Sequence, residues 1–271
     1  MSISSIGGSQ SLYRNQSLYR NQHQTQQQRN AQRLASGKRI NSAADDAAGL
    51  AIAQKLLQQQ KGLDMGTRNA ATAQDMVNVA DGGLSMISDS LQRMRELSVQ
   101  ASNSAIYGPD DRAAIQQEIS QLNEYVTSAA GSTQFNNKNL LDGTMTNAHV
   151  ASGPDGSGMN INMPNATSAS LGISGYNVTG NFDISAIDSA LNNVSSARSS
   201  LGATYNRLGY TINNNSYTSL NTSAAHSRIE DLDYGKAVSD KKKDDLLKEY
   251  RILMQRKQQE QYGTVNRLLK F

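Results

Sequence analysis

The amino-acid sequence predicts a mainly α-helical protein: an elongated antiparallel helical bundle or coiled coil with a small β-hairpin and loop region in the middle of the chain. Alanine, leucine, methionine and glutamine crowd the segments that have helical spacing. Aromatic residues make up only 5% of the 271 residues, so a large aromatic-packed core is not expected. Because helical periodicity occupies both ends of the chain and an irregular segment lies between them, we expect the N- and C-termini to be adjacent.

The first segment of the chain is polar. Residues 11–16 and 17–22 are an exact tandem repeat, and a glutamine-rich stretch follows up to Gln32. Glutamine, arginine and alanine are fair helix formers, but the apolar face is narrow, so we expect a helix that is ordered only when it packs against neighbours. Gly37 is predicted to end this helix in the left-handed conformation.

A long helix is predicted to begin near Ser42 as N-cap, with Asp45 and Asp46 in its first turn, and to end near residue 104. Two apolar columns recur every seven residues, which is typical of a coiled-coil seam. Small residues in the seam, among them Gly66, indicate close contact with another helix. The columns are Leu56, Leu63, Ala70, Val77, Leu84 and Leu91, and Ile52, Ala73, Ala80, Ile87, Met94 and Ala101.

Three further helices are predicted. Gly108 and Pro109 mark a tight reversal, after which a second helix returns antiparallel and ends near Gly131. Helical periodicity resumes at Ile184, and a basic amphipathic helix begins near residue 236. We expect the strongest core positions of the seams to be Leu56, Leu63, Val77, Leu84, Ile87, Leu91, Leu201, Leu208 and Ile212.

Charge and composition restrict the function. The net charge of +3 divides into about +5 in residues 1–45, +5 in residues 236–271 and, by difference, −7 between them. The chain has no cysteine and only three histidines, far apart in sequence, so we expect no catalytic activity, no metal site and no cofactor. It lacks a secretory signal pattern and a long apolar run, so we expect no membrane segment and, if the protein is exported, another export route.

Seven blocks of the sequence match known signatures: residues 34–53, 91–101, 115–119, 133–143, 197–203, 206–208 and 227–233. Together they resemble the N- and C-terminal signatures of the bacterial flagellins over residues 34–145 and 184–235. The chain departs from that pattern at its two extremes, which are unusually polar, and in a short middle region that implies no large outer domain.

The resemblance implies a structural subunit that polymerises into the flagellar filament for motility. The terminal helices would form the inner filament domain, the central helices a rod domain, and the middle segment would complete the rod domain. It further implies an extracellular protein that is exported without a cleaved signal peptide and meets an export chaperone, the filament cap and hook-associated proteins. These three domains correspond to residues 1–41 with 236–271, residues 42–131 with 183–235, and residues 132–182.

The resemblance also implies a receptor or assembly face. In flagellins that the innate Toll-like flagellin receptor recognises, an arginine, a leucine and a glutamate form the contact, and they match Arg93, Leu97 and Glu118 of this sequence. The same face would be buried between copies of the chain in the filament. We therefore expect these three side chains to lie together on an exposed face.

Other functions remain open at this stage. Within the same machine, a hook–filament junction protein or a specialised minor flagellin would share the terminal blocks. A secreted coiled-coil adhesin would explain the helices but not the blocks. The basic ends would suit nucleic acid, but they lack interleaved aromatic residues and a recognition motif, so we expect no nucleic-acid partner.

Overall fold

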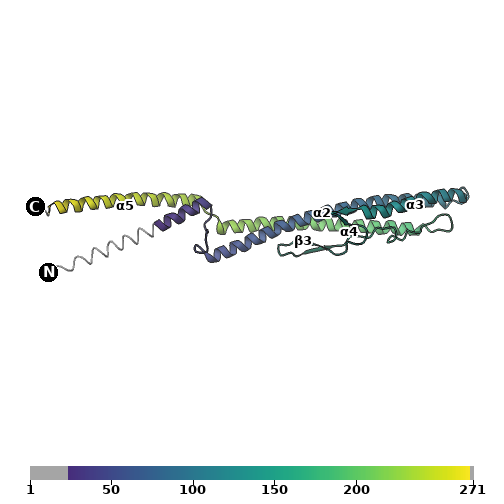
Figure 1. Ribbon diagram of the computed structural model, residues 1–271, viewed down its shortest axis with the longest axis horizontal. Coiled ribbons are helices and arrows are strands. Elements are labelled where there is room, and N and C mark those ends of the chain that lie inside the picture. The colour runs from purple at the N-terminus through teal and green to yellow at the C-terminus, as the bar shows by residue number, and fades with distance from the viewer. Residues whose placement is uncertain (1–23, 269–271) are drawn as a thin grey trace. The chain divides into compact units, whose positions relative to one another are not determined.

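The computed structural model describes residues 24–268 and confirms the predicted mainly α-helical class (Figure 1). A helix over residues 24–36 is followed by four longer helices and two small antiparallel hairpins. The predicted adjacency of the termini, and the tandem repeat, lie outside the described residues. The named elements are α2 (Ala47–Ala101), α3 (Pro109–Ser132), β1 (Gln134–Phe135), β2 (Lys138–Asn139), β3 (Ala148–Ala151), β4 (Gly158–Ile161), α4 (Ser185–Glu230) and α5 (Tyr234–Leu268).

The boundaries of the first two helices follow from local hydrogen bonding. Gly37 has φ +70° and its N–H donates to the Arg33 carbonyl, which confirms that it ends the first helix. The long helix begins at Ala47, so the prediction of Asp45 and Asp46 in its first turn is wrong. Asp46 instead accepts a hydrogen bond from the Gly49 N–H at 2.8 Å and acts as the N-cap, while the Asp45 carboxylate holds the preceding loop.

The chain divides into two compact units. The terminal unit comprises residues up to 57 together with those from 223 onward, and the central unit comprises residues 58–222. Both predicted domain boundaries, near 41 and 236, fall within the terminal unit. In the central unit, β3 and β4 form a hairpin in which Ala148 pairs with Ile161.

The core of the central unit lies where α2, α3 and α4 run side by side (Figure 1). Its members recur at heptad spacing along α2 and α4, so the seams are built from the apolar columns of the sequence. Ile212 is only partly buried and packs against this core. The other predicted seam residues of this unit are all buried: Leu63, Val77, Leu84, Ile87, Leu91, Leu201 and Leu208.

The first turns of α2 do not continue the core. Ile52 is 51% exposed and Leu56 is only partly buried, so the two columns do not form a buried seam here as expected. Both residues belong to the terminal unit, in whose described part Ile40 and Ala53 are the buried apolar side chains. The apolar heptad pattern of α2 therefore begins before the part of the helix that neighbouring helices cover.

Two glycines of α2, Gly62 and Gly66, face the segment between β3 and β4. A Cβ on Gly66 would collide with the Ser152 carbonyl, and one on Gly62 would lie 2.6 Å from the Pro154 carbonyl oxygen. The side-chain amides of Asn69 and Asn215 donate to the carbonyls at the start of the hairpin turn, at 2.8 and 2.7 Å. Gly62 and Gly66 therefore seat the β3–β4 hairpin. The side-chain amide of Asn215 of α4 would also lie 3.3 Å from a Cβ at Gly66, in agreement with the predicted close contact with another helix.

Candidate functional site

A charged cluster on the surface of the central unit contains two of the three predicted face residues. The Arg93 guanidinium of α2 donates to the Glu118 carboxylate of α3, with Nε to Oε1 at 2.9 Å, and also to Glu96 at 3.2 Å. The side chains of Arg93 and Glu118 are 50% and 45% exposed. The hydrogen bonds that Arg93 donates to Glu118 and Glu96 raise the pKa of Arg93, so the cation is permanent. Because both side chains are half in water, they remain available to a partner.

Leu97 does not lie on this surface. It is 2% exposed and belongs to the core, so the expectation of three exposed neighbours is wrong for this residue. Both α3 and α4 pack along this part of α2, and the buried band is therefore wider than a single seam: Met94, Leu97, Ser98 and Ala101 are all covered. Leu97 therefore affects the charged cluster only indirectly, because it packs α2 against the core.

Two further residues extend the face and were not predicted from the sequence. The Tyr125 hydroxyl of α3 donates to the Met86 sulfur of α2 at 3.7 Å, and both side chains are 47% exposed. Met86 lies seven residues before Arg93, and Tyr125 seven residues after Glu118, so the two pairs repeat along an antiparallel helix pair. We call Met86, Arg93, Glu118 and Tyr125 the α2–α3 face. The heptad step from Arg93 and Glu118 would have identified the other two.

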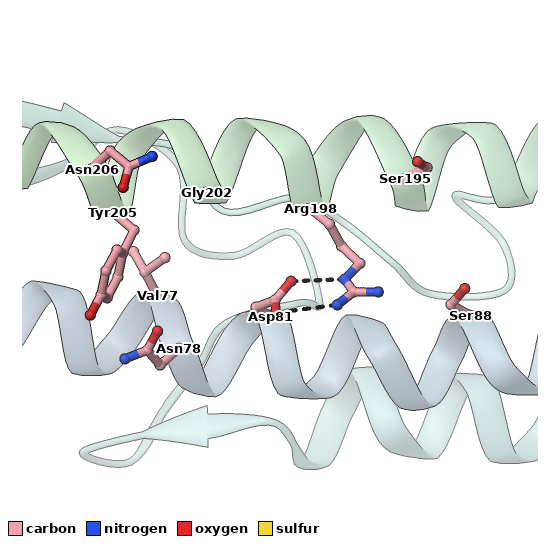
Figure 2. A pocket seen from close by; sticks show the side chains of 9 residues that line it. All are labelled: Val77, Asn78, Asp81, Ser88, Ser195, Arg198, Gly202, Tyr205 and Asn206. Carbon is pink, nitrogen blue, oxygen red and sulfur yellow. Dashed lines mark hydrogen bonds and ion pairs between the residues drawn. The ribbon is translucent and has the colours of Figure 1, made fainter.

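A groove of about 460 Å³ lies between α2 and α4 (Figure 2). Arg198 of α4 donates to both carboxylate oxygens of Asp81 of α2, at 2.8 and 3.3 Å, and this raises the pKa of Arg198. Its wall also holds Tyr205 and Val77, which lie together away from the ion pair. The two charged lining residues, Asp81 and Arg198, pair with each other.

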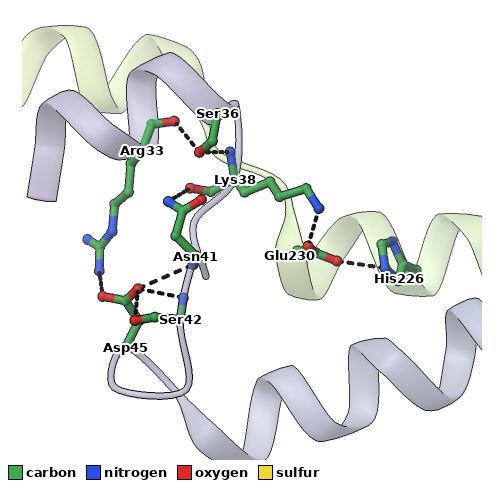
Figure 3. Close-up of polar contacts among 8 residues, drawn as sticks. All are labelled: Arg33, Ser36, Lys38, Asn41, Ser42, Asp45, His226 and Glu230. Carbon is green, nitrogen blue, oxygen red and sulfur yellow. Dashed lines mark hydrogen bonds and ion pairs between the residues drawn. The ribbon is translucent and has the colours of Figure 1, made fainter.

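In the terminal unit, polar contacts connect an early segment of the chain, near residue 38, with a late segment, near residue 230 (Figure 3). The Arg39 N–H donates to the Glu230 carbonyl at 2.7 Å, and the Leu232 N–H donates to the Gly37 carbonyl at 2.9 Å. The buried Glu230 carboxylate also lies 2.6 Å from the Lys38 ammonium. On its other side Glu230 lies 2.7 Å from Nε2 of His226. We call these contacts the terminal joint.

A second carboxylate fixes the loop that enters the joint. Asp45 accepts hydrogen bonds from the N–H groups of Asn41 and Ser42 and from the Ser42 hydroxyl, and it lies 3.4 Å from the Arg33 guanidinium (Figure 3). These contacts, with that from Asn41 the largest, lower the pKa of Asp45. The loop between the first helix and α2 is therefore held by an ionised side chain.

Within residues 24–268, the side chains of histidine and the acidic residues form no group of three that would hold a metal ion. Across the same residues, no helix is long and apolar enough to span a bilayer.

Comparison with known families gives matches at both ends of the chain. The family model for the bacterial flagellin N-terminal helical region matches residues 9–146. The model for the bacterial flagellin C-terminal helical region matches residues 184–269. The two matched segments contain the α2–α3 face and both sides of the terminal joint.

Individual relatives agree with the family models. A flagellar filament core protein of Brachyspira hyodysenteriae is 34% identical over 236 residues, which cover 80% of this chain and 82% of that protein. A flagellin of Listeria innocua is 37% identical over 238 residues and covers 80% of each chain. Among solved structures, a flagellar hook-associated protein from Vibrio parahaemolyticus aligns with a TM-score of 0.57 at 18% identity, over 69% of this chain and all of that one, and this shows a shared fold.

Proposed function

Because the chain belongs to the bacterial flagellin family, we propose that its two units have different tasks in the flagellar filament. The protein is a structural subunit that polymerises into this extracellular filament. In the proposal, residues 42–131 and 183–235 form the rod domain, which residues 132–182 complete. Residues 1–41 and 236–271 form the inner filament domain.

The division of tasks is supported by the distribution of apolar side chains. The central unit has a continuous buried core and folds around it, whereas α5 of the terminal unit exposes its large apolar residues. Leu246, Tyr250 and Leu253 are 66%, 62% and 58% exposed. Exposed apolar side chains that follow one another along a helix, as in α5, are normally covered by a neighbouring molecule in a stable assembly. The terminal unit is therefore the part of the chain that becomes fully packed in the polymer.

The observation that carries the function is the match to flagellin models at both ends of one chain, and electron microscopy tests it. Purified full-length protein, seeded or salted out, is compared by negative stain with a chain trimmed of residues 1–33 and 240–271. We expect long uniform filaments from the full chain and none from the trimmed chain. A full chain that remains monomeric, or only caps existing filaments, would contradict the proposal and favour a junction protein.

We propose that the α2–α3 face is also read by the host Toll-like flagellin receptor. Arg93 and Glu118 supply a half-exposed, hydrogen-bonded ion pair of the kind found in interface hot spots, and Leu97 supports it from the core. We expect Arg93→Ala to lower signalling in cells that express the receptor. The matched control is Arg95→Ala, because Arg95 is equally exposed on α2 but pairs with Asp188 of α4. Equal loss from both variants would exclude a specific role for Arg93.

The remaining partners follow from assembly outside the cell. We propose that the chain is exported without a cleaved signal peptide and that a chaperone holds it before export. We also propose that the filament cap and the hook-associated proteins lie at the ends of the polymer. Membership of the flagellin family, whose filament is extracellular, supports the proposal of export. Mass spectrometry of shed filaments tests it: an N-terminus at Met1 or Ser2 is expected, and a terminus some twenty residues further on would contradict it.

A further inference from the structure

The outer face of α4 in the central unit is almost without charge. Between Ser185 and Thr222, Arg207 is the one charged residue among the exposed positions, and the others are serine, asparagine, alanine, glycine, tyrosine and leucine. The other charged side chains of this part of α4, Asp188 and Arg198, pair with α2. The exposed side of α2 is different, because charged residues recur along it: Lys61, Asp64, Arg68, Asp75, Asp89, Arg93, Arg95 and Glu96.

The same outer face carries the most exposed large apolar side chains of the central unit's α4. Tyr210, Tyr217 and Leu220 are 76%, 71% and 68% exposed. Tyr210 and Tyr217 are seven residues apart and lie on one side, while Leu208 and Asn215, two residues before each, are buried on the other side. We call Tyr210, Tyr217 and Leu220, with the exposed Asn213 and Asn214, the tyrosine face.

This composition is unusual for a helix that faces water. Water-facing helix surfaces normally carry charged residues, and isolated exposed apolar residues need no explanation. Depletion of charge together with enrichment in tyrosine is instead the signature of the covered core of a protein interface. A tyrosine supplies a large contact area with few rotatable bonds, and its hydroxyl tolerates water in the unbound state. The tyrosine face therefore has the character of a contact surface that is uncovered in the single chain.

We propose that a second copy of this chain covers the tyrosine face in the filament, through the α2–α3 face of that copy. The inference rests on the polymerisation described above. Contacts in a helical polymer are heterologous, so two different faces of the same chain must complement each other. The α2–α3 face offers Met86 and Tyr125 for the tyrosines, since thioethers pack well against aromatic rings.

Charge complementarity supports this occupant. Around the α2–α3 face, the acidic residues Asp89, Glu96 and Glu118 outnumber the cation Arg93, which pairs with Glu96 and Glu118. Between Ser185 and Thr222 of α4, the only charged residue at an exposed position, Arg207, has the opposite sign. A neutral surface with one cation fits an apolar surface with an excess of carboxylates, and it would not fit a second copy of itself.

The absence of cysteine from the chain makes the contact measurable. The variant Tyr217→Cys introduces a single thiol at a 71% exposed position, so the fold is not disturbed. Its rate of reaction with a maleimide is measured in the monomer and in filaments that electron microscopy has verified. The matched control is Asp155→Cys, at an exposed position in the turn between β3 and β4.

We expect the thiol at 217 to react at least ~10-fold more slowly in filaments than in monomers, because the core of an interface excludes solvent, while the thiol at 155 keeps its rate. A variant at 217 that stays helical but no longer assembles would support the proposal as well. Equal rates at 217 in the two states, or equal slowing at 155 and 217, would overturn it. If the unmodified chain forms no filaments, the polymerisation itself fails, which is a distinguishable result.

A charge variant tests the orientation of the contact. Arg207→Glu places a carboxylate opposite the acidic α2–α3 face, and we expect the critical concentration for polymerisation to rise several-fold, whereas Arg207→Lys leaves it near that of the parent. Because Arg207 is exposed, neither variant alters the core. If Arg207→Glu polymerises like Arg207→Lys, the α2–α3 face is not the covering surface.

Discussion

The Lys38 ammonium lies 2.6 Å from the carboxylate of Glu230, and this ion pair joins residues from opposite ends of the sequence. The Lys38 side chain is 51% exposed, whereas that of Glu230 is only 10% exposed. The buried carboxylate therefore depends on the Lys38 ammonium for charge compensation. Burial of one partner makes the terminal joint more sensitive to loss of charge than an ordinary surface pair.

We predict that Glu230→Gln loosens the terminal joint. The amide keeps the shape of the side chain but loses the ion pair, and a stability loss of about 1–2 kcal/mol is expected for a partly exposed pair. Hydrogen exchange of the Arg39 and Leu232 amides, which bridge the joint, should then become roughly 10-fold faster. Lys242→Gln, an exposed residue of α5, serves as the control and should leave both rates unchanged. Unchanged exchange in Glu230→Gln would mean that the backbone contacts alone hold the joint.

The acid stability of the loops should depend on carboxylates that anchor turns. Hydrogen bonds from Thr144, Ser157 and Ser185 hold the pKa values of Asp142, Asp155 and Asp183 below 3.8. Because the folded-state pKa values are lowered, the stabilisation is present above pH 3.8 and is lost as the pH falls through the folded values.

The triple variant in which these three aspartates become asparagine tests this dependence. We expect its midpoint of thermal unfolding to fall less steeply than that of the parent between about pH 4 and pH 2. The slopes are compared by circular dichroism in the same buffers. Parallel slopes for the two proteins would show that other groups govern acid unfolding.

The β3–β4 hairpin should respond to pH with the opposite sign. The two ring nitrogens of His149 lie 3.0 Å from the Asn160 side-chain oxygen and 3.2 Å from the Gly156 carbonyl oxygen. Two acceptors favour the doubly protonated ring, and these contacts raise the pKa of His149 above 6.5. The stabilisation is therefore present below pH 6.5 and is lost as the pH rises through the folded value.

Amide exchange of β3 and β4 measures this effect. After correction for intrinsic rates, protection of the hairpin should decrease between pH 6 and pH 8 in the parent chain, and the decrease should be absent in His149→Gln. Protection of α3 provides an internal reference. A decrease of the same size in the variant would mean that the histidine has no part in it.

Two glycines of α2 form a matched pair that tests whether the β3–β4 hairpin packs against this helix. Gly66→Ala forces a methyl group against the Ser152 carbonyl, and overpacking of this kind costs about 1–3 kcal/mol. Gly82→Ala meets no atom within 4 Å and should gain about 0.5–1 kcal/mol through helix propensity. Urea unfolding measures both. If the two variants are equally stable, the hairpin does not pack on α2 as the structure describes.

Truncation of seam residues should separate the two ends of α2. Leu91 is fully buried, and Leu91→Ala should destabilise the central unit by about 2–5 kcal/mol, because a cavity replaces the side chain. Leu56 is partly exposed, so Leu56→Ala should cost less than about 1.5 kcal/mol. Urea midpoints give both values. Similar losses at the two positions would mean that the seam is continuous along the helix.

The heptad pattern was sufficient to predict the helices and most of their buried positions, because a regular apolar stripe must be covered wherever a helix is long. It did not show where along α2 the neighbouring helices stop covering the stripe, so the exposure of Ile52 was not predicted. Leu97 illustrates the opposite error: two helices pack on α2 there, and a position beside the seam becomes buried. The number of neighbours is a tertiary property that the spacing of apolar residues does not contain.

The contacts of glycines and of the α2–α3 face depend on tertiary structure in the same way. Gly66 is a small residue in a seam, and only the position of the hairpin shows that a loop approaches it. Met86 and Tyr125 become neighbours through the antiparallel register of α2 and α3. Once Arg93 and Glu118 fix that register, the heptad step predicts the second pair.

The pairing of early and late segments has a consequence for how the chain folds. The core of the central unit unites α2 with α4, and the terminal joint unites residues 37–39 with 230–232, so many stabilising contacts have a large separation in sequence. Such contacts form slowly, because closure of a long loop must precede them. While a chain is being synthesised, α3 can cover only part of the apolar columns of α2, and the rest has no cover until α4 has emerged. The terminal joint needs residues 230–232 and closes after that. A chain whose late segment is still being synthesised, or is still passing through an export channel, therefore cannot complete its fold, because its early segment lacks its partner.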